Sequence, residues 1–313
     1  MKQRLNNLAI VLLIILMMSA GCDPYEDYIE DFDFSIAYFS TQKPLRTIVA
    51  YDAMSFKVGV ALGGKRTNET SEVIGFELDP SLLDNPEVVG NNQFELLPDN
   101  YYSIDGEEMV VPVGEFIGDV TVNLNTELFT TDSLSSQNHY AIPLRITSST
   151  TDSVAIGSFD ESGNSIVTAK DYTVVVVKYI SPLQGTYYKQ GVQKELDAEG
   201  VELNEVVYND PDLVKNPTWE LLTVNRYSVS TSGVGSFDDG SLVLSLDRAT
   251  NQASITTESA AITELSGKGS YDPEQGVFQL DYTFQRQGRS YAVSERLTIR
   301  QAPEKDLRFE EWQ

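Results

Sequence analysis

Short segments in which every second residue is apolar recur along most of the chain. Residues 47–51 (TIVAY) and 55–62 (SFKVGVAL) show this alternation first, and residues 119–124 (DVTVNL) and 277–284 (VFQLDYTF) repeat it. A period of two residues is typical of β-strands that bury one face. No segment shows convincing helical periodicity, so the pattern predicts an all-β protein.

The strands fall into two groups on either side of Ser181-Pro182, which is the predicted domain boundary. The number and spacing of the short strands in residues 35–181 favour an immunoglobulin-like β-sandwich. In residues 182–313 the strands form an antiparallel meander, which predicts a β-barrel or a strongly twisted sheet. Residues 195–217 interrupt this second group. They are polar, acidic and aperiodic, and are predicted to form a long surface loop.

The N-terminus has the organisation of a bacterial lipoprotein signal peptide. Basic residues precede an apolar run at residues 8–18, whose 11 residues are fewer than the roughly 20 that a membrane-spanning helix needs. Ser19-Ala20-Gly21-Cys22 then resembles a lipobox. We predict that residues 1–21 are removed and that Cys22 takes the lipid; the alternative is an ordinary signal peptide with a chance cysteine. Cys22 is the only cysteine, so disulfides and cysteine-bound metals are excluded.

An acidic excess marks both the next segment and the chain as a whole. Residues 22–34 contain six acids and no base, which is typical of a solvated tether. The formal net charge of the chain is −25. Nucleic acids and anionic lipid surfaces attract basic proteins, so we expect neither as a partner. The acyl chains are predicted to hold the protein on the membrane.

Four segments carry a resemblance to a known family. Residues 140–146 (YAIPLRI), residues 171–183, Gly185-Thr186-Tyr187 and residues 307–312 (LRFEEW) are similar to the two-domain surface lipoproteins of Bacteroides-type polysaccharide-utilisation systems. Those proteins combine an N-terminal β-sandwich and a C-terminal β-domain, both of unknown function. The resemblance implies a lipoprotein on the outer face of the outer membrane that captures an oligosaccharide or polysaccharide. It allows an outer-membrane transporter complex as a partner, and it supplies no binding residues.

Two further motifs resemble O-glycosylation sites of the same kind of bacterium. Ser133 stands in a DSL triplet and Ser153 in a DSV triplet. Modification would require a loop position for either serine. Such triplets also arise by chance, and the alternative of unmodified serines stays open.

The residues needed for common catalytic mechanisms are missing or unpaired. His139 is the only histidine, no G-x-S-x-G elbow supplies a triad serine, and no phosphate-binding glycine loop is present. A glycosidase needs only two carboxylates, and the 47 acidic residues leave that alternative open. Acidic turns at residues 160–164 and 238–240 are candidate calcium sites, but they lack EF-hand spacing and are better explained as hairpin turns. We therefore predict neither an enzyme nor a metal or other cofactor.

Aromatic side chains are the best candidates for contact with a glycan, because sugar rings present C–H faces that stack on flat side chains. Five in the second domain are selected: Trp219, Tyr208, Tyr187, Tyr188 and Tyr227. The alternative is that they fill the core or pair across strands. The hypothesis is a surface lipoprotein whose second domain binds glycans without chemistry, behind an N-terminal spacer. The runner-up is a structural or adhesive envelope lipoprotein that acts through protein–protein contacts, and a glycosidase is third.

Overall fold

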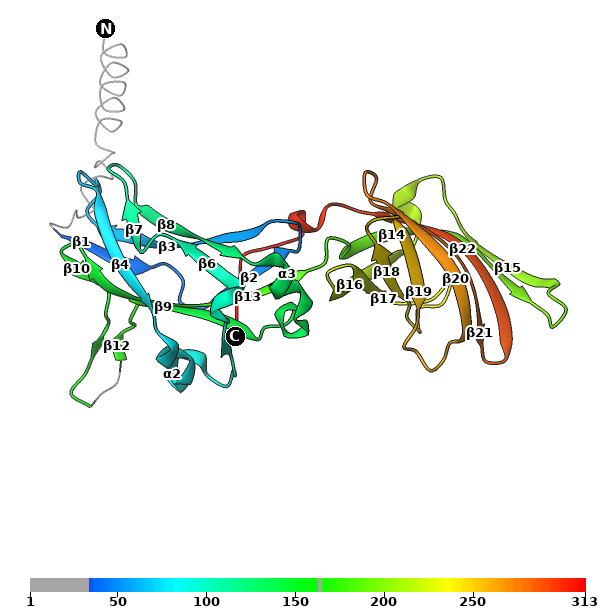
Figure 1. Cartoon of the computed structure of the whole chain (residues 1–313), viewed down its shortest axis with the longest axis horizontal. Helices are drawn as coiled ribbons and strands as arrows, with labels where there is room; N and C mark the ends of the chain where they lie inside the picture. Colours follow the sequence, from blue (N-terminus) through cyan, green and yellow to red (C-terminus); the bar gives the residue numbers. More distant parts are fainter. Residues whose placement is uncertain (1–33, 163–164) are drawn as a thin grey trace, which may run out of the picture.

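The chain forms two β-rich lobes placed end to end (Figure 1). The structure is a computed structural model that describes residues 34–162 and 165–313. The predicted signal peptide, Cys22 and all of the acidic tether except Phe34 lie outside these residues. Helical segments are short, for example α2 (Pro86–Val89) and α3 (Thr126–Thr131), and no helix of the described residues is long and apolar enough to cross a membrane. The all-β prediction is confirmed.

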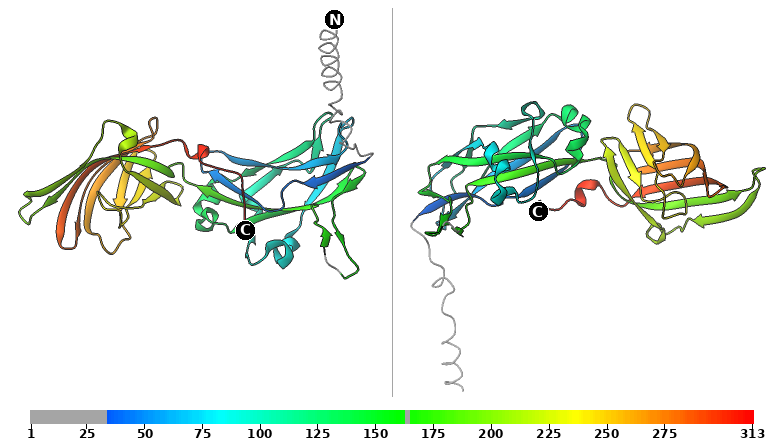
Figure 2. Two further views of the ribbon diagram at one scale, coloured as in Figure 1. Left: turned by 180° about the vertical axis from the view of Figure 1, so that it is seen from behind. Right: turned by 90° about the horizontal axis from the view of Figure 1, so that it is seen from below.

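The N-terminal lobe is a sandwich of two sheets (Figure 2). The first sheet contains, in spatial order, β10 (Ser153–Val154), β1 (Ser35–Phe39), β3 (Met54–Gly64), β8 (Ile117–Leu124) and β6 (Tyr102–Asp105). The second contains β23 (Glu310–Glu311), β2 (Pro44–Val49), β13 (Tyr172–Ile180), β9 (Tyr140–Ser149), β4 (Glu72–Leu78) and β7 (Glu108–Val111), with β5 (Glu95–Leu96) beside β9. Buried side chains such as Phe39, Val60 and Ile142 form one core between the sheets. The predicted β-sandwich is confirmed.

Strand β13 shows how burial shapes the sequence pattern. All four valines of residues 174–177 are fully buried. Alternate valines belong to the core between the sheets and to a second apolar cluster that contains Trp312 and residues of α2. A strand covered on both faces has no polar side, and this explains why the alternation seen in β8 is absent here.

The C-terminal lobe is a closed antiparallel barrel, as the meander predicted. Its strands are β14 (Gly185–Leu196), β16 (Thr218–Asn225), β17 (Ser228–Thr231), β18 (Val243–Asp247), β19 (Gln252–Thr256), β20 (Thr263–Asp272), β21 (Val277–Arg286) and β22 (Arg289–Ile299). Strand β22 pairs with β21 on one side and with β14 on the other, and this second pairing closes the barrel. Aromatic and aliphatic side chains, including Tyr187, Trp219 and Phe278, fill the interior.

A strand occupies the segment that was predicted to be a long surface loop, so this part of the prediction is wrong. Strand β15 (Glu202–Tyr208) pairs with the outer end of β14 and projects beyond the barrel (Figure 1). The side chains of residues 202–207 are all exposed, so neither face of the strand required apolar residues. Without a buried face there is no period of two for the sequence to show.

The end of the chain returns to the sandwich, although residues 182–313 were assigned as one C-terminal domain. After β22 the chain runs through the short 3₁₀ segment η6 (Pro303–Lys305), and β23 then pairs with β2 of the sandwich. The indole N–H of Trp312 donates to the carbonyl oxygen of Val174 at 2.8 Å, and its ring meets Phe94 edge-on at 5.0 Å. The two lobes are therefore joined twice, once by residues 181–184 and once by this returning segment.

Candidate functional site

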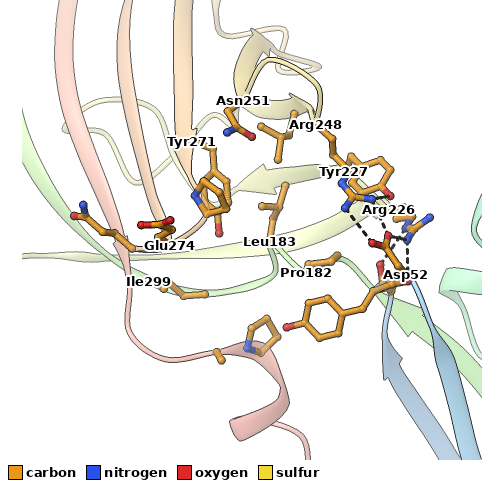
Figure 3. Close-up of a pocket in the computed structure, with 18 of the residues that line it drawn as sticks. Asp52, Pro182, Leu183, Arg226, Tyr227, Arg248, Asn251, Tyr271, Glu274 and Ile299 are labelled. Atoms are coloured by element: carbon orange, nitrogen blue, oxygen red, sulfur yellow. Dashed lines mark hydrogen bonds and ion pairs between the residues drawn. The ribbon is translucent and has the colours of Figure 1, made fainter.

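A pocket of about 870 Å³ lies at the junction between the sandwich and the barrel (Figure 3). Four parts of the chain line it: the turn at residues 50–53 of the sandwich, the crossover at Pro182 and Leu183, the barrel loops, and the returning segment at Ala302 and Pro303. The volume is in the range of ligand pockets in proteins, and an interface between two folded lobes is a common place for one. We refer to it as the junction pocket.

Two arginines of the barrel hold one wall of the junction pocket against the sandwich. Arg226 donates to the carbonyl oxygens of Ala50 and Tyr51 at 3.0 and 2.8 Å, and to the carboxylate of Asp52 at 3.0 Å. Arg248 donates to the same carboxylate at 2.8 Å. Hydrogen bonding and charge from Arg248, supported by Arg226, hold the pKa of Asp52 below its usual value. These contacts fix the turn that carries Tyr51.

Three tyrosines present aromatic surface in the junction pocket. The Tyr227 ring lies 4.9 Å from the Arg226 guanidinium and 5.3 Å from that of Arg248, which also donates to its hydroxyl at 3.0 Å. Tyr51 is 42% exposed and donates to Glu304 at 2.8 Å. Burial, followed by the Glu304 contact, raises its pKa to about 12. Tyr271 is held by a ring contact with Phe278 at 4.5 Å.

Apolar and polar groups alternate around the rest of the junction pocket. Leu183 and Ile299 contribute apolar surface, and Asn251 and Glu274 bring an amide and a carboxylate group to the same pocket (Figure 3). Gln275 is a further polar residue of the lining. Asn251 sits in a left-handed conformation, with φ of 56°, in the tight turn after β18. Its carbonyl oxygen accepts from the Tyr271 N–H at 2.9 Å, so the turn and the tyrosine are held together.

The chemistry of the junction pocket favours binding over catalysis. Flat rings with hydroxyl tips, an apolar floor and several hydrogen-bonding groups suit a ligand that has both C–H faces and hydroxyls. A glycosidase acid must keep its proton near neutral pH. The low pKa of Asp52, which bridges two guanidiniums, means that this carboxylate cannot serve as that acid. Within the described residues no group of three or more His, Cys, Asp or Glu side chains is placed to hold a metal ion.

Of the five predicted ligand-binding aromatics, Tyr227 alone lines the junction pocket. Trp219 and Tyr187 are buried in the barrel core, where a ligand cannot reach them. Tyr208 is buried against Glu295, and Tyr188 lies on the barrel wall without lining the pocket. Tyr51 and Tyr271 were missed. Tyr51 is the last residue of a predicted strand of the other domain, and nothing in the sequence places it opposite the barrel.

Trp219 instead forms part of a buried polar cluster inside the barrel. The Lys189 ammonium lies 4.1 Å from the Trp219 ring and 4.9 Å from the Tyr208 ring, and it donates to the carbonyl oxygen of Gly235 at 2.6 Å. Tyr208 and Tyr282 donate their hydroxyl protons to the two oxygens of Glu295 at 3.0 and 2.8 Å. We refer to these groups as the barrel cluster.

Because of the barrel cluster, the free energy of unfolding should decrease as the pH rises. Burial raises the pKa of Glu295 to about 7 from an ordinary value of 4.5, although hydrogen bonds from Tyr282 and Tyr208 and the charge of Lys189 oppose the rise. The folded state therefore holds this proton more tightly than the unfolded chain. That contribution is complete below pH 4.5 and is lost as the pH rises through 7, and it amounts to about 3 kcal/mol at 1.36 kcal/mol per pKa unit.

Glu295→Gln removes this titration and keeps an acceptor for the tyrosines. We expect the stability of the native protein relative to the variant to fall by about 3 kcal/mol between pH 4 and pH 8. Urea unfolding followed by fluorescence at several pH values measures this difference. A constant difference over that range would show that Glu295 does not titrate there.

The remaining predicted sites lie away from the junction pocket. Ser133 is exposed at the start of the 3₁₀ segment η4 (Ser133–Ser136), and Ser153 is exposed in β10 and not in a loop. Their glycosylation stays a prediction. His139 lies 3.5 Å from the Glu95 carboxylate and packs edge-on against Tyr140. In the acidic turn at residues 238–240, Asp239 forms a double contact with Arg286 at 2.7 and 2.6 Å.

Comparison with known proteins supports the two-domain reading. A protein-family model described as an N-terminal domain matches residues 29–153, which is less than half of the chain. No curated protein matches the sequence. Among solved structures, a Bacteroides ovatus protein of unknown function has a TM-score of 0.74 and 21% sequence identity, over 89% of this chain and 99% of that chain. The chain therefore shares its two-domain all-β fold with a Bacteroides protein, which confirms the resemblance to Bacteroides-type two-domain proteins.

Two other solved structures are more distant. One is a multidomain protein including DUF1735 from Bacteroides ovatus, with a TM-score of 0.41 and 13% identity over 90% of this chain and 100% of that chain. The other is an auxiliary nutrient binding protein from Bacteroides thetaiotaomicron, with a TM-score of 0.40 and 14% identity over 86% of this chain and 95% of that chain. At these scores the similarity carries no argument about the present chain.

Proposed function

We propose that this protein is a cell-surface lipoprotein that binds glycans without catalysis, as part of a polysaccharide-utilisation system. The observation that carries the proposal is the junction pocket, where Tyr51, Tyr227 and Tyr271 surround an apolar floor and face amide and carboxylate groups. Sugar rings need this combination, because their C–H faces stack on aromatic rings while their hydroxyls exchange hydrogen bonds with polar side chains.

The proposal places the binding site at the junction and not within the barrel. The pocket includes residues of the sandwich, so the sandwich is more than a spacer: its turn at residues 50–53 completes the site. In this proposal Cys22 carries the lipid, the outer membrane holds the protein, and an outer-membrane transporter complex receives the glycan. Mass spectrometry of the protein from native membranes tests the anchor, and an unmodified Cys22 would overturn it.

Tyr227→Ala should weaken glycan binding by roughly tenfold, because it removes a stacking ring and frees two guanidiniums from their packed position. The measurement is a glycan array with the protein that starts after Cys22, followed by calorimetry on the polysaccharides that bind. Tyr188→Ala is the matched control, since this tyrosine lies on the barrel wall outside the pocket. If the folded native protein bound no polysaccharide, or released sugar from one, the proposal would fail.

One observation favours the runner-up, a structural or adhesive protein that acts through protein–protein contacts. Strand β15 pairs only with β14 among the described strands, and Val201, Leu203 and Val207 beside or within it are each more than half exposed. A strand that has an unpaired edge and exposed apolar side chains can accept a strand from another protein. A stoichiometric partner that co-purifies with the native chain, and is lost with Leu203→Lys, would favour this function.

A further inference from the structure

A cluster of exposed apolar side chains caps the end of the sandwich that lies farthest from the barrel. Phe34, Val113, Phe116 and Ile117 are 44%, 62%, 37% and 64% exposed. We call these four residues the tip. Exposed apolar side chains scattered singly are ordinary, but a group of them at one end of a monomer indicates a contact surface.

Strand pairing brings the four residues of the tip together. Ser35, which follows Phe34, pairs with Gly64 at the end of β3. On the other side of β3, Leu62 donates its N–H to the carbonyl oxygen of Phe116 at 2.9 Å, and Ala61 pairs with Ile117. Because β1, β3 and β8 are neighbours in one sheet, Phe34 and the β7–β8 loop border the same end of that sheet (Figure 1).

The loop that carries Val113 and Phe116 is braced by a single side chain. The Asn68 amide donates to the carbonyl oxygens of Pro112 and Glu115 at 2.9 and 3.0 Å. The backbone carbonyl of Asn68 accepts from the N–H of Gly114 at 2.8 Å. The backbone of the loop that carries Val113 and Phe116 is therefore fixed by the fold, so ordering this loop on a partner costs little entropy.

We propose that the tip rests on the lipid bilayer that holds the acyl chains of Cys22. This inference depends on the lipid anchor of the proposed function but not on glycan binding. Twelve residues lead from Cys22 to Phe34, so the tip stays within about 40 Å of the anchored end even if the linker is fully extended. Such tethering gives a weak apolar contact a high effective concentration at the surface.

The charge of the protein determines what kind of membrane contact is favourable. A net charge of −25 repels anionic headgroups, so a broad electrostatic contact is excluded. A small apolar contact keeps most of this charge away from the headgroups; Glu115 is the acidic residue exposed between Val113 and Phe116. In the neighbouring β3–β4 turn, Lys65 pairs with Asp152 at 3.6 Å. The barrel and the junction pocket lie at the other end of the sandwich and would point away from the bilayer (Figure 2).

A tryptophan introduced at the tip tests the contact directly. Both native tryptophans are buried, Trp219 in the barrel and Trp312 against the sandwich, so the indole of Phe116→Trp is the exposed one. The protein that begins at Cys22 contains every described element, and its single cysteine can be coupled to a maleimide lipid. The vesicles consist of phosphatidylcholine, part of which is dibrominated. We expect bromine to quench the new indole at least twofold more than in Phe309→Trp, a control placed at an exposed position in the C-terminal segment.

A second variant separates insertion from mere proximity. Val113→Asp with Ile117→Asp places two charges in the exposed part of the tip, where they should not disturb the fold, and circular dichroism checks that it persists. In the Phe116→Trp background this pair should reduce quenching to the level of the Phe309→Trp control. Equal quenching of the tip and control indoles, or quenching that survives the two aspartates, would overturn the proposal. Chemical coupling makes either result independent of glycan binding and of acylation in cells.

Discussion

Lys189→Met is expected to lower the free energy of unfolding of the barrel by about 3–5 kcal/mol at pH 8. At that pH Glu295, whose pKa is about 7, is mostly ionised, and the positive charge of Lys189 stabilises the ionised carboxylate. Methionine has nearly the same length but no charge, so the variant leaves a buried carboxylate without its cation and the carbonyl oxygen of Gly235 without its donor. Removing one partner from a buried charged cluster is among the most destabilising single changes in proteins.

Lys194→Met is the matched control for this prediction. Lys194 lies on the same strand, but its side chain is about half exposed and pairs with Glu202 at the surface, so its loss should lower the stability far less than the loss of Lys189. Urea unfolding followed by the fluorescence of Trp219, which contacts Lys189, reports on the barrel. The cost of Lys189→Met should be smaller at pH 5, where Glu295 is protonated, and Glu295→Gln should recover much of it at pH 8. A native-like unfolding midpoint for Lys189→Met at pH 8 would contradict the assignment.

Trp312→Ala should destabilise the sandwich by about 3–5 kcal/mol, the usual cost of truncating a buried aromatic side chain. The indole fills the space between β13 and α2, donates to Val174 and holds β23 on the edge of β2. Its loss should also release the returning segment, which supplies Glu304 as the acceptor for Tyr51 in the junction pocket. We therefore expect weaker glycan binding as a second consequence.

Amide hydrogen exchange in β2 and β13 measures this effect, because the fluorescence of Trp312 is lost with the substitution. Phe309→Ala is the control in the same segment: Phe309 is largely exposed, so its truncation should cost less than about 1 kcal/mol. Unchanged protection of β13 in Trp312→Ala would show that the sandwich holds without the returning segment.

Strand β15 and most residues of the junction pocket could not be predicted from the sequence. Alternation revealed the strands that bury one face, but β15 buries neither face and was read as a loop. Two of the aromatics selected as ligand contacts are buried for a related reason. Trp219 and Tyr187 are residue types that commonly stack on sugar rings. Each, however, points into the barrel from its strand and is buried in the barrel core. Of the five selected, Tyr227 alone reached the pocket, because it follows β16 in a turn at the junction.

The amino-acid sequence by itself determined that this chain is an all-β protein with a sandwich followed by a barrel, since period-two burial and turn chemistry are local properties. It also showed that residues for the common catalytic sets are few. Only the tertiary structure decided that the C-terminus returns to the sandwich and that Tyr51, Tyr227 and Tyr271 meet at one pocket. Those facts depend on how two lobes sit against each other. Contacts between residues more than 250 positions apart, such as the hydrogen bond from Tyr51 to Glu304, leave no periodic trace in the chain.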